Sequence, residues 1–298
     1  MTSLVRSAHA KLNLFLRVLG PRDDGYHDVE TVIVPISLHD VVTVEPAEEL
    51  SVTVSGPTAA GVADGEANLA LRAARAVAAE AGGAASRGAR IAIEKRIPVA
   101  AGLGGGSADA AATILALDEL WAVGLDRVAL HRIALAVGSD VPALILGEPA
   151  FVGGRGDVVE PVLLQSTSWV LRTFGFGISS ADAYGWWDER AATGPDPGAL
   201  IAAAEAGDDA LLGSAIYNDL QGPVVSRHPE IAAAIEALLS AGALGAVMSG
   251  SGPTVAALCP FGRARSIAEA VPGTIVVDTP PRARAPARIE GTDPSGVV

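Results

Sequence analysis

PVAAGLGGGSADAAA, from Pro98 to Ala112, is the most informative stretch of this sequence. A strand-like run, Ala89–Glu94, precedes it, and an alanine-rich segment with apolar residues at helical spacing, Ala108–Trp121, follows it. Glycines let the backbone approach a ligand closely, and a helix N-terminus adds unpaired N–H groups and the positive end of its dipole. The stretch therefore predicts an anion site, most naturally for phosphate.

Other interpretations of the same residues fit less well. In a flexible connector the glycines would need no cap, yet Ser107 stands in a position that predicts an N-cap. No lysine follows the glycines, as a P-loop requires. The dinucleotide-binding fingerprint would need a third glycine where Ser107 stands. Neither of the common nucleotide loops is therefore predicted.

Composition limits the function classes. Half of the 298 residues are hydrophobic, which predicts a folded chain with a substantial core, long enough for two domains. The net charge of −13 argues against nucleic-acid and anionic-membrane partners, so an anionic ligand needs local donors. The single cysteine, Cys259, excludes an internal disulfide. No secretory signal pattern or long apolar run is visible, so a cytoplasmic protein is expected.

The chain begins with a strand-rich region. Leu4–Leu19 alternates as a long strand, on which Lys11 and Asn13 share one face, and a solvated face is as good an interpretation of this pair as a functional one. Further strands are predicted at Val29–Ile36, Val41–Glu45 and Leu50–Ser55. Such an antiparallel-rich opening argues against a classical doubly wound sheet.

Helices with capping signals follow. Asn68 stands in the N-cap position of a helix that extends to Ala81. Later, Gly138 ends a helix and Ser139–Pro142 starts a short one, with Asp140 near its cap and Pro142 at or near N1. Asp140 is thus either a plain helix cap or a carboxylate placed to act as a base.

The second half predicts a separate α+β sandwich. A second glycine loop, Gly245–Thr254, leads into the strand Val255–Leu258. We place the domain boundary near residue 160, which gives an N-terminal domain over 1–160 and a C-terminal domain over 161–279. The Pro/Arg-rich residues 280–298 are predicted to form a disordered tail.

Three motifs in this order resemble the GHMP kinase superfamily: Ala10–Leu14, the PxxxGLGGGS loop and the late GxxxSGSGPT stretch. The resemblance implies a two-domain α+β fold, with an N-terminal domain like the second domain of ribosomal protein S5 and a ferredoxin-like C-terminal α/β sandwich. Three further motifs resemble those of the branch that acts on a cytidylyl-linked methylerythritol: Gly25–His27, the sequence GLGGGSADAA and Gly138–Pro142.

For this branch the resemblance implies transfer of the ATP γ-phosphate, with Mg²⁺, to the tertiary 2-hydroxyl of the methylerythritol. It assigns Asp140 as the base and Lys11 as its partner, with Asn13 on the substrate. A carboxylate can accept the hydroxyl proton, and a neighbouring lysine keeps it ionised. The implied ATP-binding residues are Asn68, Lys95, Pro98, Gly102, Leu103, Gly104, Gly105, Gly106 and Ser107, and those of the second glycine loop are Ser249, Gly250, Ser251 and Gly252.

The resemblance also implies a cytosine site. Tyr26 and Tyr184 match an aromatic pair that sandwiches the base, and His27 matches the residue that reads its edge. Ser180 matches a substrate-contacting threonine. Taken alone, Tyr26 would be expected to pack against the sheet and His27 to lie at the surface.

The sequence departs from the branch's pattern in two places. A proline is usual at His9, and the loop Ile178–Ala181 lacks the usual prolines. Because His9 is close to Lys11 in sequence, it is a further candidate to line the site.

Two alternative functions remain open. One is another GHMP kinase, of the homoserine or mevalonate type. The other is an inactive ligand-sensing relative, against which intact Lys11 and Asp140 argue. The sequence does not identify the ligands of Mg²⁺. We expect the protein to be a monomer or a weak homodimer.

Overall fold

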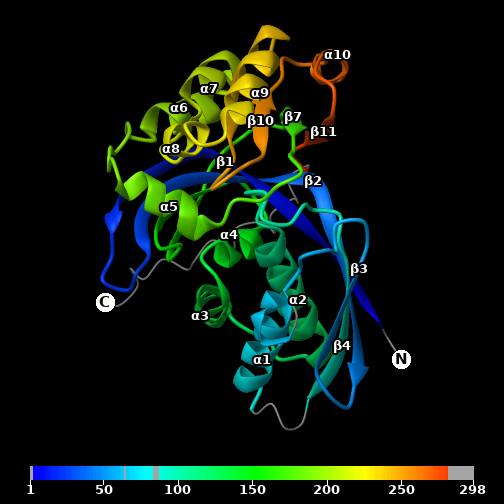
Figure 1. The fold of residues 1–298 in the computed structure, drawn as a ribbon. Helices are drawn as coiled ribbons and strands as arrows, with labels where there is room; N and C mark the ends of the chain where they lie inside the picture. The colour runs from blue at the N-terminus through cyan, green and yellow to red at the C-terminus, as the bar shows by residue number, and fades with distance from the viewer. Residues whose placement is uncertain (1–2, 64, 83–86, 281–298) are drawn as a thin grey trace, which may run out of the picture.

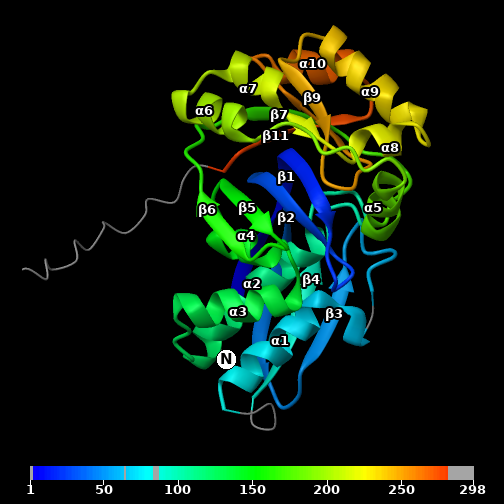
Figure 2. The same cartoon turned by 90° about the vertical axis from the view of Figure 1, so that its left-hand side faces the viewer.

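The computed structural model describes residues 3–63, 65–82 and 87–280. Within them the chain forms a seven-stranded and a four-stranded sheet with helices, as the α+β prediction requires. The long strands β1 (Leu4–Pro21) and β2 (His27–Ala47) cross the middle, between helices α1–α4 and the C-terminal half (Figures 1 and 2). The tail predicted over 280–298 lies, from residue 281 on, outside the described residues.

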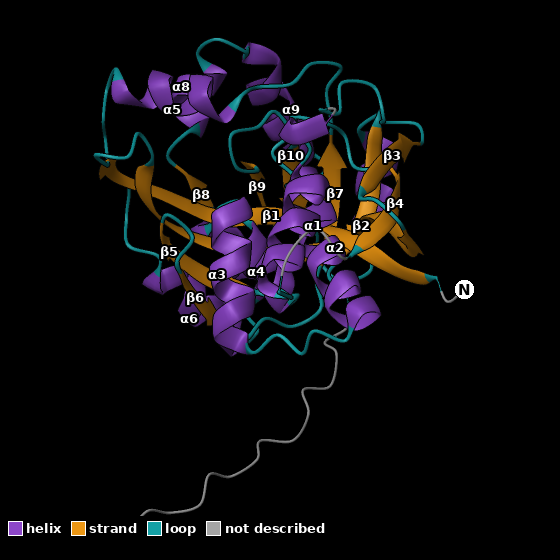
Figure 3. Cartoon of the chain, turned by 90° about the horizontal axis from the view of Figure 1, so that it is seen from below, coloured by secondary structure: helices purple, strands orange, loops and turns teal. Residues whose placement is uncertain are grey.

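The larger sheet has the order β3-β4-β2-β1-β8, in which β8 is the short strand Tyr217–Asn218, and β5 is paired to β2 and β6 to β5. Helix α2 packs on both long strands and against α1, α3 and α4, and these helices gather on one side of the sheet (Figure 3). The remaining elements of the first half are β3 (Ser51–Ser55), η1 (Gly65–Ala67), α1 (Leu69–Glu80), β4 (Gly88–Glu94), α2 (Gly105–Trp121), α3 (Arg127–Val137), α4 (Val141–Leu146), β5 (Ala150–Gly154) and β6 (Val158–Pro161).

The second strand corrects a prediction. We expected separate strands at Val29–Ile36 and Val41–Glu45, but β2 is continuous because its polar middle stays paired with β1. His39 lies opposite His9 there, and the neighbouring Asp40 is fully buried. The tertiary context therefore overrides the weak strand propensity of these residues.

The smaller sheet has the antiparallel order β11-β7-β10-β9, with its first and third strands in the centre, which is the ferredoxin-like arrangement. The predicted glycine loop Gly245–Thr254 is partly wrong, because its first four residues form β9, paired with β10. The elements of this half are β7 (Ser168–Arg172), α5 (Ser180–Asp188), α6 (Gly198–Ala206), α7 (Asp209–Ala215), β8 (Tyr217–Asn218), α8 (Gln221–Val225), α9 (Pro229–Ser240), β9 (Gly245–Met248), β10 (Val255–Leu258), α10 (Ala264–Ala270) and β11 (Thr274–Asp278).

The short strand β8 returns to the larger sheet and pairs in parallel with β1. The boundary near residue 160 therefore stays a prediction, since the second half contributes a strand to the first sheet. Among the described residues, no helix combines the length and apolar character needed to cross a bilayer.

Candidate active site

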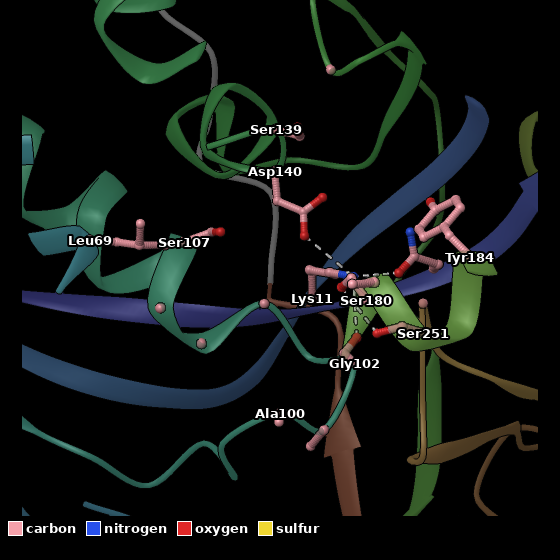
Figure 4. Close-up of a pocket in the computed structure, with 18 of the residues that line it drawn as sticks. Lys11, Leu69, Ala100, Gly102, Ser107, Ser139, Asp140, Ser180, Tyr184 and Ser251 are labelled. Carbon is pink, nitrogen blue, oxygen red and sulfur yellow. Dashed lines mark hydrogen bonds and ion pairs between the residues drawn. The ribbon is translucent and has the colours of Figure 1, made fainter. Parts of the chain in front are cut away.

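A cavity of about 870 Å³ lies where the loop after β4, the start of α2 and the loop after β9 meet. Figure 4 shows Lys11 and Asp140 facing each other there, with Ser107 on one side and Tyr184 on the other. The predicted site residues that line it are Lys11, Asn13, Tyr26, His27, Asn68, Lys95, Pro98, Gly102, Gly104, Gly105, Gly106, Ser107, Asp140, Ser180, Tyr184, Gly250 and Ser251.

Three predicted residues, Leu103, Ser249 and Gly252, are not among the lining residues. Leu103 belongs to the hydrophobic core. Ser249 is fully buried, and its hydroxyl donates to the Gly102 carbonyl at 3.0 Å and accepts from the Asn13 backbone N–H at 3.2 Å. The Ser249 hydroxyl thus links the second glycine loop to Gly102 and to β1.

Lys11 and Asn13 share a face of β1, as the alternation predicted, but that face is not solvated. Both residues are buried, because α2 and the second half of the chain together cover β1. The Lys11 ammonium donates to Asn13 Oδ1 and, at 3.2 Å, to the Gly102 carbonyl. It lies 3.5 Å from Asp140 Oδ2. The lysine charge is therefore fixed at the edge of the cavity.

Asp140 occupies the N-cap position of α4, with proline in the first turn, as expected. Its side chain makes no capping hydrogen bond, so the plain-cap interpretation is wrong for the carboxylate. The carboxylate is 35% exposed and faces Lys11. Burial, and to a smaller degree the Asp140 charge, raises the pKa of the Tyr184 hydroxyl. The Asp140 carboxylate is thus not used by the cap of α4, and it lines the cavity beside Lys11.

The loop before α2 corrects the predicted cap. The N-cap residue is Gly104, in a left-handed conformation with φ of 69°, and Ser107 is the third residue of the helix. A Cβ on Gly102, where φ is +75°, would overlap the Ser249 carbonyl. The close approach of two loops therefore requires glycine here. The first-turn N–H groups of α2 lack partners within the helix, and the residues that carry them, Gly105, Gly106 and Ser107, line the cavity.

Lys95 is enclosed by two carboxylates beneath this loop. Its ammonium contacts Asp40 and lies 2.7 Å from Asp109 Oδ2, and all three side chains are buried. A Cβ on Gly105 would lie 3.2 Å from the Lys95 ammonium. Burial raises the pKa of Asp109 to about 7, although the Lys95 charge opposes this. The cluster ties β2, β4 and α2 together behind the loop.

Asn68 caps α1 as predicted, with its side-chain oxygen accepting from the Ala70 N–H at 2.9 Å. Its amide also donates to the Ala63 carbonyl at 3.1 Å. Asn68 and Lys95 both line the cavity, so their predicted place near adenine stays a prediction.

Aromatic residues occupy the other end of the cavity. The His27 ring stacks on Tyr184 with centroids 4.8 Å apart, and His27 Nε2 lies 2.9 Å from Asp188 Oδ1. Tyr26 is 52% exposed, and the Arg155 guanidinium carbon lies 4.5 Å from its ring centroid. Both simpler expectations are thus wrong, because Tyr26 is exposed and the His27 side chain is 11% exposed. Sequence reasoning missed Asp188 and Arg155.

The loop that lacks prolines closes against the glycine loops. Ser180 Oγ lies 3.4 Å from Ser251 Oγ, and the Ile178 N–H donates to the Ala100 carbonyl at 3.1 Å. His9, which we considered as a lining residue, does not line the cavity: its Nδ1 lies 2.9 Å from the Ile36 carbonyl.

The family models agree with this arrangement. The model described as "GHMP kinases N terminal domain" matches residues 68–148, and the one described as "GHMP kinases C terminal" matches residues 200–276. A homoserine kinase structure from Cytophaga hutchinsonii shares the fold, with a TM-score of 0.69 at 17% identity over 94% of this chain and 95% of that one. Fold and site define a GHMP kinase.

More similar proteins narrow the family. A protein of Symbiobacterium thermophilum named 4-diphosphocytidyl-2-C-methyl-D-erythritol kinase is 49% identical over 85% of this chain and 89% of its own length. A crystal structure titled 4-(cytidine 5'-diphospho)-2C-methyl-D-erythritol kinase has a TM-score of 0.76 at 34% identity, and the match covers 92% of this chain and 98% of that one. The chain belongs to the 4-diphosphocytidyl-2-C-methyl-D-erythritol kinase family.

Proposed function

We propose that this protein transfers the γ-phosphoryl group of ATP to the 2-hydroxyl of 4-diphosphocytidyl-2-C-methyl-D-erythritol, giving the 2-phosphate and ADP. The reaction belongs to the non-mevalonate route to isoprenoid precursors. The observation that carries this proposal is the ion pair between Lys11 and Asp140 beside a glycine loop, in a member of this family.

In the proposed mechanism Asp140 accepts the proton of the attacking hydroxyl as the new P–O bond forms. Lys11, 3.5 Å from this carboxylate, positions it and stabilises negative charge on the transferring phosphoryl group. Asn13 lines the cavity and remains the residue that we expect on the substrate; its Oδ1 accepts from the Lys11 ammonium, and its amide donates to Thr31 Oγ1 at 2.8 Å. Gly102–Ser107 and the N-terminus of α2 hold the β- and γ-phosphates.

Magnesium is the expected partner of ATP. No group of three or more His, Cys, Asp or Glu residues in the described parts of the chain forms a dedicated metal cage. Oxygen donors nevertheless line the cavity in the Ser107 hydroxyl and the Asp140 carboxylate. This donor set fits Mg²⁺, which binds mainly through substrate phosphates and water with one or two protein oxygens. When bound, the ion would offset phosphate charge.

The two ends of the cavity suit the two nucleotides. We assign the region of Asn68, Lys95 and Pro98 to the adenosine part of ATP, and Ser251 to the junction of the loops. Tyr26, His27 and Tyr184 form the cytosine site, with Ser180 near the sugar alcohol. Because His27 covers one face of Tyr184, the base is expected on the other face or in place of the imidazole.

ADP release with Mg-ATP tests the proposal, using the cytidylyl substrate, homoserine, mevalonate and galactose in parallel. Turnover with the cytidylyl substrate alone, with ³¹P NMR placing the new phosphate on the 2-hydroxyl, is the expected result. Turnover with another alcohol would refute the substrate, and ATP binding without any turnover would favour a sensor. We further expect the enzyme to act in the cytoplasm as a monomer or weak homodimer, without nucleic-acid partners.

A further inference from the structure

The lysine and arginine side chains that line the cavity differ in how firmly they are engaged. Among the described residues, Lys11 is buried against Asp140, and Lys95 is enclosed by two buried carboxylates. Arg155 also lines the cavity, but its contacts are long: it donates to the uncharged Leu135 carbonyl at 3.4 Å, and its acidic neighbour Asp24 lies 3.7 Å away with a side chain that is 39% exposed. Exposed pairs of this kind contribute little, so the charge of Arg155 is available to a ligand.

Arg155 lies in the turn between β5 and β6, and this turn is fixed beside the proposed base. Gly156 has φ of +104°, and a Cβ there would overlap the carbonyl of Ser139, the residue before Asp140. On its other side the Arg155 guanidinium lies over the Tyr26 ring. Arg155 therefore stands between the reacting end of the cavity and its aromatic end.

We propose that Arg155 binds the diphosphate that links cytidine to methylerythritol in the substrate, an inference that rests on the proposed function. In the substrate this diphosphate lies between the base and the alcohol, just as Arg155 lies between Tyr26 and Asp140. A guanidinium presents paired N–H donors that match phosphate oxygens. On a chain with a net charge of −13, a bound diphosphate requires such a local cation.

A competing role for Arg155 is to orient the Tyr26 ring by a cation–π contact. Two ligands separate the roles, because cytidine carries the base without phosphate and cytidine diphosphate carries both. The experiment titrates each ligand into the full chain, with the ATP site saturated by a non-hydrolysable ATP analogue. The variants are Arg155→Gln, Arg155→Lys and a control.

Arg227 provides the matched control. Its guanidinium carbon lies 4.9 Å from the Trp186 ring centroid, and it pairs with Glu189 at 2.6 Å. Its side chain is 34% exposed, against 30% for Arg155, but it does not line the cavity. Arg227→Gln removes the same kind of ring contact and the same charge from a residue outside the cavity lining.

Arg155→Gln is expected to lower the affinity for cytidine diphosphate by roughly tenfold to a hundredfold, as for loss of a charge-assisted contact. The affinity for cytidine should stay within about twofold of wild type. The affinity of Arg155→Lys for cytidine diphosphate should lie between those of wild type and Arg155→Gln, and the affinities of Arg227→Gln should match wild type. If Arg155→Gln loses affinity equally for both ligands, Arg155 orients the Tyr26 ring and the inference is overturned. Unchanged affinity for cytidine diphosphate would also overturn it. If the wild-type protein binds neither ligand, the proposed substrate fails and the inference fails with it.

Discussion

Lys11 and Asp140 lie 3.5 Å apart, although one is in the middle of the first strand and the other begins a short helix. The two partners are held unequally. The Lys11 side chain is 5% exposed and also donates to Asn13 and to the Gly102 carbonyl, whereas the Asp140 side chain is 35% exposed. The protein thus fixes the cation, and the cation in turn positions a carboxylate that still faces the cavity.

Replacing Asp140 with Asn should lower turnover by roughly a hundredfold to ten-thousandfold, because the amide cannot accept the hydroxyl proton. ATP affinity should change by less than about threefold, since the phosphates are assigned to the glycine loop and α2. Steady-state ADP release measures turnover, and titration with a fluorescent ATP analogue measures binding.

Asp196→Asn is a suitable control, since its carboxylate is 79% exposed and does not line the cavity. It should keep full activity. Turnover of Asp140→Asn within threefold of wild type would remove Asp140 as the base.

The sequence allowed much of the fold to be predicted, and the exceptions have physical causes. The first strand was expected over Leu4–Leu19 and is found over Leu4–Pro21. A long alternation of apolar and polar residues is a local pattern that indicates a strand without knowledge of its partners. The continuity of β2 was missed, because its polar middle contains Asp40. This buried carboxylate contacts Lys95 and accepts hydrogen bonds from the backbone N–H groups of Arg96 and Ile97. No local pattern shows such a partner.

The candidate site divides in a similar way. Lys11, Asn13 and Asp140 could be named from the motifs, and the structure brings them into one cavity, although their roles stay predictions. Arg155 was missed because a glycine-rich turn indicates a hairpin and does not indicate what the turn faces. A charged residue flanked by glycines was the one available signal.

Tyr184→Ala should weaken the cytidylyl substrate, because the ring offers a stacking surface worth about 1–3 kcal/mol per base. The KM for this substrate should rise, while the KM for ATP stays constant. Tyr184→Phe retains the ring and should behave like wild type. Equal substrate KM values for the Ala variant and wild type would show that the base does not stack on Tyr184.

Gly102→Ala should destabilise the protein by about 1–3 kcal/mol or more, because the added Cβ meets the Ser249 carbonyl at a φ of +75°. Gly106→Ala is the contrast, since a Cβ there would make ordinary contact with Leu69 at 3.5 Å. Denaturant unfolding compares the two variants with wild type. A similar loss in both, or none in Gly102→Ala, would contradict the close packing of the two glycine loops.

Asp109 should make stability depend on pH. Burial raises its pKa from 3.8 to about 7 in the folded chain, so the folded state binds this proton more tightly than the unfolded state. Stability then falls as the pH rises from about 4 to about 7, and the loss is complete above that. Asp109→Asn cannot ionise, and it leaves Lys95 paired with Asp40. The stability of the variant should therefore fall less than that of wild type as the pH rises from about 4 to about 7.

Calorimetry at pH 5, 6, 7 and 8 measures the effect as the Tm of Asp109→Asn minus that of wild type. This difference should increase with pH and reach roughly 2 °C or more in favour of the variant at pH 8, since about 1 kcal/mol corresponds to roughly 2–4 °C in a chain of this size. A difference for Asp109→Asn that stays constant or shrinks with pH would mean that the folded protein does not favour the protonated carboxyl, and that Lys95 holds Asp109 ionised.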